Sequence, residues 1–110
     1  MGITKTEIFS NTQNEISILF KVLGNPARVA ILEYLMNVDS CICGDITQEV
    51  GLAQPTVSQH LKELRNAGLI KGSINGNSIC YCIDKMHWKR ARKMINSFMK
   101  KDIIGLKNCC

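Results

Sequence analysis

The sequence of 110 residues has no apolar run that approaches the length of a membrane-spanning helix. Its first residues, Met-Gly-Ile-Thr-Lys-Thr-Glu, do not resemble a secretory signal, so we expect a cytoplasmic protein that does not enter a membrane. It also has no Cys-x-x-Cys motif and no combination of Cys, His and Asp that indicates an active site. We therefore expect no enzymatic activity, and a small thiol enzyme is retained only as an alternative of another class.

The chain is long enough for one domain with a modest core, so residues 1–110 are taken as a single unit. Hydrophobic residues make up 45% of the chain, which favours a folded domain over disorder. Small domains of this kind often gain stability from a second subunit.

Charge is unevenly distributed along a chain whose net charge is +5. All of the excess lies from Asp84 onward, where Asp84 and Asp102 are outnumbered by the basic residues Lys85, Lys89, Arg90, Arg92, Lys93, Lys100, Lys101 and Lys107. This excess indicates either a polyanionic partner or a solvated helix face.

Six cysteines form three close pairs, Cys41/Cys43, Cys80/Cys82 and Cys109/Cys110. Disulfides within such pairs would close very small rings. In a reducing cytoplasm we expect free thiols that meet a soft metal ion or an oxidant.

Apolar spacing and turn residues predict four helices in the first two thirds of the chain. The first covers about 6–23 and ends at Gly24; the second begins at Pro26 with Asn25 as its cap, and its stripe is Val29, Leu32, Leu35 and Met36, widened by Ile31 and Tyr34. A short third helix covers about 45–50, and the fourth covers 54–67. The last two are separated by a glycine turn at Gly51, which is the spacing of a helix-turn-helix.

The helix over 54–67 has two different faces. Val57, Leu61 and Leu64 lie on one face by their spacing and are expected in the core. The other face carries short polar side chains and two cations: Thr56, Ser58, Gln59, Lys62 and Arg65, with His60 on the flank. Such a face can place polar groups at base edges and cations at phosphates, although an isolated helix of this kind is more often simply solvated.

Residues 69–74 and 77–83 read as two strands joined by Asn75-Gly76, a strong signal for a β-hairpin. A hairpin directly after a recognition helix is a wing. Lys71 lies on it, and its small polar residues near the tip can approach a phosphate backbone.

A last helix is expected over 84–101, with Asp84 as its cap and Trp88, Ala91, Ile95, Phe98 and Met99 on one face. We expect this helix and the helix over 6–23 to form a homodimer interface, because little core remains for them to cover. Residues 102–110 would then be a flexible tail that carries Cys109 and Cys110.

Three segments together resemble the bacterial ArsR/SmtB family of winged-helix repressors. They are Leu-Gly-Asn-Pro-Ala-Arg-Val-Ala-Ile-Leu over 23–32, the stretch from Gly44-Asp-Ile through Gln54-Pro-Thr-Val-Ser-Gln-His-Leu to Ile70, and Tyr-Cys-Ile over 81–83. The resemblance implies a mainly α protein with one small β-hairpin in the order ααααββα. It also implies a homodimer that binds double-stranded operator DNA without a cofactor and leaves it when a metal or metalloid ion binds. The polar face of the helix over 54–67, the hairpin and the resemblance together predict the DNA-binding residues. They are Gln54, Thr56, Ser58, Gln59, His60, Lys62, Arg65, Lys71 and Asn75.

Two departures from the family pattern matter. Many relatives have Ser or Thr where this chain has Ala53, so the cap of the recognition helix is missing. Of the zinc site on the last helix only Asp84 matches, while Met86, Ser97 and Lys100 stand at the other positions. We therefore expect no zinc site of that type, and His87 is interpreted as a surface residue.

The thiol-sensing relatives are more similar. Cys41-Ile-Cys43-Gly-Asp45 resembles the Cys-x-Cys-Asp of arsenite sensors, shifted by one residue, and Cys109-Cys110 resembles a C-terminal pair of other relatives. The candidate ligands for arsenite, antimonite or another soft ion are thus Cys41, Cys43, Cys109 and Cys110. Cys80 and Cys82 point to one side of their strand and read equally well as small buried residues.

Two further hypotheses stay open. A thiol redox switch on the same scaffold would lose DNA affinity on oxidation without any metal. A domain that binds only proteins would fail to bind any duplex at low salt.

Overall fold

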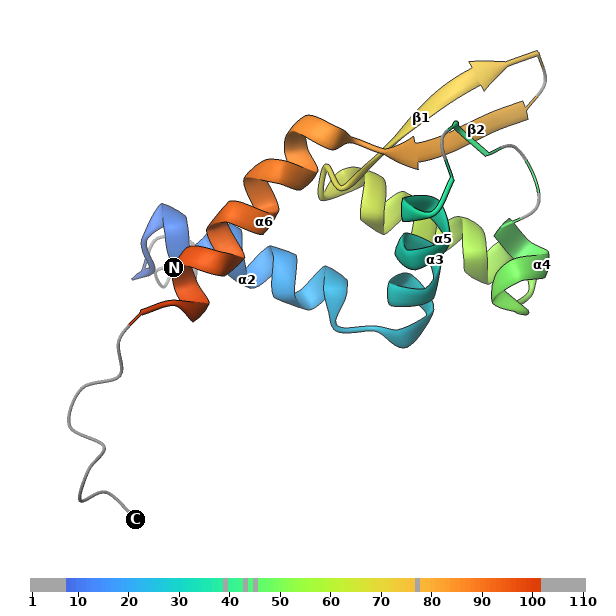
Figure 1. The fold of residues 1–110 in the computed structure, drawn as a ribbon. Coiled ribbons are helices and arrows are strands. Elements are labelled where there is room, and N and C mark those ends of the chain that lie inside the picture. Colours follow the sequence, from blue (N-terminus) through green and yellow to red (C-terminus); the bar gives the residue numbers. More distant parts are fainter. Residues whose placement is uncertain (1–7, 39, 43, 45, 77, 102–110) are drawn as a thin grey trace.

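The computed structural model describes residues 8–38, 40–42, 44, 46–76 and 78–101. Its elements are α2 (Asn11–Leu23), α3 (Pro26–Met36), α4 (Ile46–Val50), α5 (Gln54–Asn66), β1 (Ile70–Asn75), β2 (Ser78–Ile83) and α6 (Lys85–Met99). This order confirms the expected ααααββα arrangement with one antiparallel hairpin. In Figure 1 the hairpin extends from one end of the helical body, while α2 and α6 form the other end.

Of the helix expected over about 6–23, α2 accounts for Asn11–Leu23, and residues 1–7 lie outside the described residues. Ser10 and Gln13 form a capping box: the Gln13 amide donates to Ser10 Oγ at 3.1 Å and the Ser10 amide donates to Gln13 Oε1 at 3.0 Å. These two bonds satisfy helix-end donors that would otherwise lack a partner. Apolar spacing alone did not reveal this start.

The second helix begins as expected, with Asn25 Oδ1 accepting from the Ala27 amide at 2.9 Å and Pro26 in the first turn. Its buried stripe is rotated relative to the prediction, however. Ile31, Leu32 and Leu35 are buried, whereas Val29 and Met36 are exposed. The reason is tertiary: α3 contacts α2, α4, α5 and β2, so neighbours on several sides determine which residues are enclosed.

One cluster forms the core and joins every helix to the hairpin. Its buried members are Leu19, Val22, Ile31, Leu32, Leu35, Ile46, Val57, Leu61, Leu64, Leu69, Ile70 and Ala91. The inner face predicted for α5 is confirmed, since Val57, Leu61 and Leu64 are all buried. Helix α5 is therefore fixed to the body through this face.

The hairpin turn is one residue later than expected. Asn75 pairs with Ser78, so it belongs to β1 and the strands are joined through Gly76, whose φ of +63° suits glycine. Asn75-Gly76 is thus not the connecting pair. The pairing of Ile70 with Ile83 fixes the register at the base of the wing.

The last helix is capped by Asp84, as expected. Asp84 Oδ1 accepts from the His87 amide at 3.2 Å, and this bond, followed by that to the His87 side chain, holds the pKa of Asp84 below its ordinary value. Ala91 is buried, Trp88 and Ile95 are half-buried, and Phe98 and Met99 are exposed.

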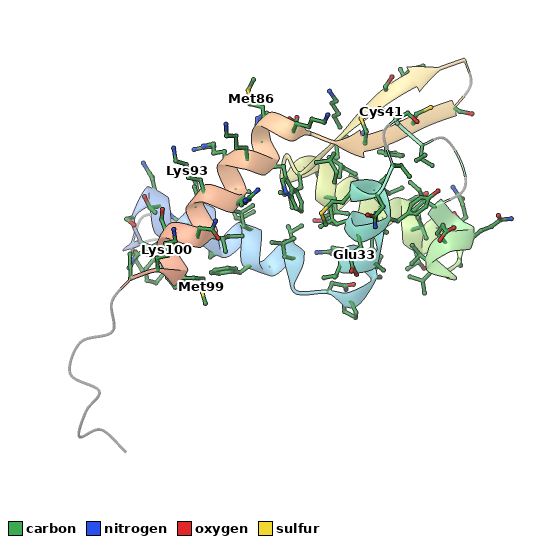
Figure 2. All side chains as sticks on the ribbon, viewed as in Figure 1. Glu33, Cys41, Met86, Lys93, Met99 and Lys100 are labelled. Carbon is green, nitrogen blue, oxygen red and sulfur yellow. A yellow bond between two sulfur atoms is a disulfide. The ribbon has the colours of Figure 1, made fainter. Side chains whose placement is uncertain are left out.

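Helix α6 lies along α2 (Figure 1), where the Phe20 and Phe98 rings meet edge to face at 5.6 Å. Arg90 also bonds Glu15 across the two helices at 3.0 Å. Met86 and Lys93 instead project outward from α6 (Figure 2). The two terminal helices therefore pair with each other while leaving apolar side chains such as Ile18 and Met99 exposed.

The start of α5 at Ala53 lacks a side-chain cap. This residue has the extended backbone of an N-cap, φ −63° and ψ 146°, but makes no side-chain hydrogen bond.

Ala53→Ser should therefore stabilise the fold by about 1 kcal/mol, because a hydroxyl there can accept from an unpaired amide of the first turn. Urea unfolding at fixed protein concentration measures the gain. Ala53→Val, which adds no acceptor, is the control, and an equal gain in both variants would contradict the capping explanation.

Candidate nucleic-acid interface

The outer face of α5 is an exposed polar surface. Its exposed residues are Gln54, Thr56, Ser58, Gln59, Lys62 and Arg65, and His60 on the flank is half-buried. The structure thus places seven of the nine predicted DNA-binding residues on one helix. Because the opposite face is buried in the core, this face is fixed in direction.

Two pairs on this face are bonded within the helix. Gln54 Nε2 donates to Ser58 Oγ at 3.1 Å, and Gln59 Nε2 donates to Glu63 Oε1 at 3.1 Å. Both bonds join residues four apart and are exposed, so a base edge can replace them at small cost. Lys62 and Arg65 are the two cations of the face.

His60 is held by a residue that the sequence analysis did not single out as part of the site. Arg28 Nε donates to His60 Nδ1 at 3.1 Å, and Arg28 Nη1 donates to the Val22 carbonyl oxygen at 3.3 Å. Arg28 therefore ties the recognition helix to α2 and α3. Since Nδ1 accepts a hydrogen bond, His60 in this arrangement presents only Nε2 to a partner.

The wing contributes Lys71, which is exposed on β1, and Asn75 at the end of that strand. At Gly72 a Cβ would stand 3.2 Å from Ile79 Cγ2, a tight contact within the wing, and 3.9 Å from Arg65 Cδ, an ordinary contact distance. The Arg65 stem therefore lies beside the hairpin at this position.

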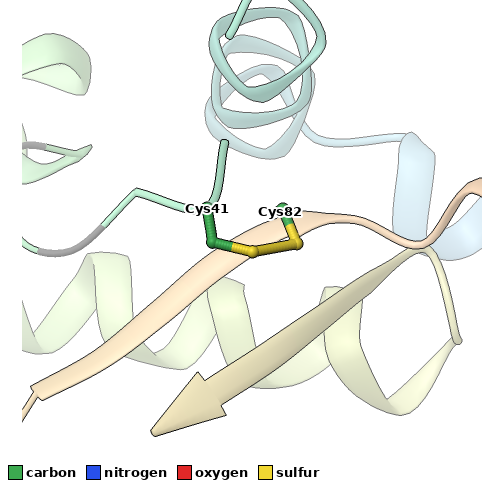
Figure 3. The surroundings of a disulfide bond; sticks show 2 residues. All are labelled: Cys41 and Cys82. Atoms are coloured by element: carbon green, nitrogen blue, oxygen red, sulfur yellow. A yellow bond between two sulfur atoms is a disulfide. The ribbon is translucent and has the colours of Figure 1, made fainter. Parts of the chain in front are cut away.

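The predicted thiol ligands are only partly covered by the structure. Cys43, Cys109 and Cys110 lie outside the described residues. Cys41 forms a disulfide with Cys82 of β2 (Figure 3), so the expectation of free thiols is wrong for these two residues. The earlier objection concerned rings closed within a close pair, whereas this bond joins residues of different pairs.

Cys80 is buried as expected, and it is likewise not a free thiol. The two Cys-x-Cys pairs, Cys41/Cys43 and Cys80/Cys82, have equal spacing. This was the feature of the sequence that could have indicated that the two segments lie side by side. Among the residues that the structure describes, no group of three His, Cys, Asp or Glu side chains could hold a metal ion. His87, which bonds Asp84 at 2.9 Å, is exposed as expected.

No helix in the described part of the chain is long and apolar enough to cross a membrane.

The family model of the bacterial regulatory proteins of the arsR family matches residues 25–71, from the start of α3 into the wing. An HTH-type transcriptional regulator of Methanocaldococcus jannaschii is 35% identical over 79 residues, which are 71% of this chain and 88% of that protein. The chain belongs to the ArsR family.

Two further regulators are similar to this chain. The regulator Rv0081 of Mycobacterium tuberculosis is 39% identical over 64 residues, 58% of this chain and 56% of that protein. Its solved structure aligns with this chain at 30% identity with a TM-score of 0.62, covering 83% of this chain and 95% of the other. The arsenical resistance operon repressor of Staphylococcus xylosus is 37% identical over 67 residues, 61% of this chain and 64% of that protein.

The chain thus spans little more than half the length of the Mycobacterium tuberculosis relative in the sequence match. The ArsR family is one of transcriptional regulators and is a non-enzymatic family, in line with the expectation from the sequence.

Proposed function

We propose that this ArsR-family protein is a sequence-specific DNA-binding repressor whose α5 enters the major groove. The observation that carries the proposal is the two-sided character of α5, with one face buried in the core and the other polar and exposed. Thr56, Ser58 and Gln59 lie in its N-terminal half, where they suit base edges. Lys62, Arg65 and Lys71 suit phosphates and would supply much of the salt-dependent affinity.

We also propose that two copies act together as a homodimer through α2 and α6. Several apolar side chains of these helices remain exposed in a single chain, among them Ile18, Phe98 and Met99. Pairing with a second copy would cover them and would present two recognition helices to a two-fold site. Such a protein acts on operator DNA in the cytoplasm.

The proposed signal is a thiophilic ion such as arsenite or antimonite. Similarity to the Staphylococcus xylosus repressor supports this choice, and the soft sulfur ligands of the candidate residues Cys41, Cys43, Cys109 and Cys110 fit such ions. Cys41 precedes α4, the helix that contacts both α3 and α5. An ion bound there can oppose DNA binding through these helices by a coupling free energy.

A second candidate signal is oxidation, and a specific observation favours it. Cys41 is already bonded to Cys82, so one proposed ion ligand is consumed in the oxidised chain. Arsenite and an oxidant therefore need separate trials.

The test begins with duplexes selected from a random pool by the reduced protein. Saturating arsenite is expected to weaken binding to a selected duplex at least fivefold, in the range of typical coupling energies. Cys41→Ser should bind the duplex normally and lose this response, while Lys89→Ala on α6 should keep both. Fluorescence anisotropy measures the affinities.

Three outcomes would overturn parts of the proposal. If hydrogen peroxide releases the duplex and arsenite does not, the signal is oxidation. If neither releases it, control by thiols is wrong. If no duplex binds even at low salt, DNA binding itself is wrong.

A further inference from the structure

The segment before α4 pairs with β2 of the wing through one isolated antiparallel β-bridge. The Ile42 amide donates to the Tyr81 carbonyl at 2.8 Å, and the Tyr81 amide donates to the Ile42 carbonyl at 2.8 Å. Two residues that exchange both bonds are a hydrogen-bonded antiparallel pair. Cys41 and Cys82, the neighbours of that pair, therefore face each other at a non-hydrogen-bonded position.

Facing residues at such a position have Cα atoms about 4.5 Å apart. For Cys41 and Cys82 the distance is 4.4 Å, so the disulfide fits the backbone pairing as it stands (Figure 3). The same pairing would hold the two sulfurs side by side after reduction. The two thiols are preorganised for each other by main-chain hydrogen bonds.

The disulfide also closes a loop that contains the helix-turn-helix and the first strand of the wing. Cys41 and Cys82 are 41 residues apart, and α4, α5 and β1 all lie between them, with most of β2. The disulfide therefore links the two ends of the segment that contains the helix-turn-helix and the wing. Its presence restrains the recognition helix and the wing together.

Both cysteines are half-buried and line an open groove of about 820 Å³ between α3, β2 and the start of α6. The groove is wide enough for a small molecule to reach the sulfurs. Its charged and titratable walls are Lys71, Asp84, Lys85 and His87. Lys71 stands opposite Cys82 in the β-ladder, and a cation beside a thiol favours its reactive thiolate form.

We propose that Cys41 and Cys82 are a reversible dithiol–disulfide couple that a small hydroperoxide oxidises through this groove. One thiolate attacks a peroxide oxygen, so that an S–O bond forms, the O–O bond breaks and hydroxide or alkoxide leaves. The second thiolate then attacks the sulfenic sulfur, the S–S bond forms and the hydroxyl leaves and is protonated to water. The sulfurs lose two electrons and the peroxide gains them, and a dithiol reductant reverses the change by two exchange steps.

Oxidation should restrain the unfolded chain, and in the folded protein it should restrain the helix-turn-helix and the wing. The closed loop predicts a melting temperature higher by roughly 10 °C in the oxidised protein. The consequence for repression rests on the proposed DNA-binding function. Because the loop closed by the disulfide contains both proposed DNA-binding elements, the oxidised and reduced forms should differ in duplex affinity by at least threefold.

The test treats the folded, reduced protein with hydrogen peroxide, blocks remaining thiols and maps the linked peptides by mass spectrometry. A Cys41–Cys82 link that a dithiol removes is expected, together with the rise in melting temperature. Cys41→Ser and Cys82→Ser should each abolish the link and reduce the rise, while a contribution from the disulfide of Cys80 can remain. Cys110→Ser, which alters a tail thiol, should keep both, and circular dichroism shows that each variant is folded.

A rise of undiminished size in both Cys41→Ser and Cys82→Ser, or a peroxide-treated protein without this link, would overturn the couple. Equal duplex affinities of the two forms would overturn its regulatory role. Failure of DNA binding itself is seen separately, because the reduced protein then binds no duplex while the link and the rise are unaffected.

Discussion

Replacing Gln59 and Lys62 together by alanine is expected to weaken binding to a selected duplex about 100-fold. Gln59 can make a bidentate contact to a base edge, which is worth about 1–3 kcal/mol, and Lys62 adds a phosphate contact. Both side chains are exposed on the outer face of α5, so their removal takes away contacts without disturbing the core. Anisotropy titrations at several salt concentrations measure the effect.

The salt dependence separates the two contributions. Lys62→Ala alone should reduce the slope of log affinity against log salt by about one, whereas Gln59→Ala should leave the slope and reduce discrimination between duplexes. Lys89→Ala on α6 removes the same charge from another element and is the matched control. A double variant that binds as tightly as the parent would show that α5 does not read DNA.

Leu64→Ala is expected to reduce the free energy of unfolding by about 3 kcal/mol, within the usual range for a buried leucine. Leu64 is fully buried on the inner face of α5, and the cavity left behind would lie in the core between the recognition helix and the body. For a domain of this size the melting temperature should fall by roughly 12–24 °C. Thermal unfolding at constant protein concentration measures it.

Lys62→Ala, two residues away on the same helix, is the control for stability and should change it by less than about 0.5 kcal/mol. The two variants thus have opposite profiles: one loses DNA affinity and keeps its stability, the other loses stability first. A Leu64→Ala protein as stable as the parent would contradict the position of this side chain in the core.

Local patterns in the sequence were sufficient for most elements. The cap Asn25, the inner face of α5 and the cap Asp84 all depend on residues within one or two helical turns, and all three predictions are confirmed. The ArsR resemblance rested on the same local segments, and the family match covers them. Interactions this short in sequence can be recognised from residue type and spacing alone.

Boundaries that depend on specific hydrogen bonds were less certain. The capping box of Ser10 fixes the start of α2 at Asn11. The pairing of Asn75 with Ser78 places the turn one residue later than predicted. Apolar spacing does not distinguish between such neighbouring positions, because the same side chains remain on the same side.

The sequence by itself determined the helix-turn-helix, the wing and the polar face of α5, because each follows from periodicity and turn chemistry. Only the tertiary structure decided that Arg28 holds His60 and that Cys41 meets Cys82. These contacts join residues 32 and 41 positions apart, and they exist because packing in the core brings α3 beside α5 and the segment before α4 beside β2. Apart from the equal spacing of the two Cys-x-Cys pairs, no local pattern indicates that these segments come together.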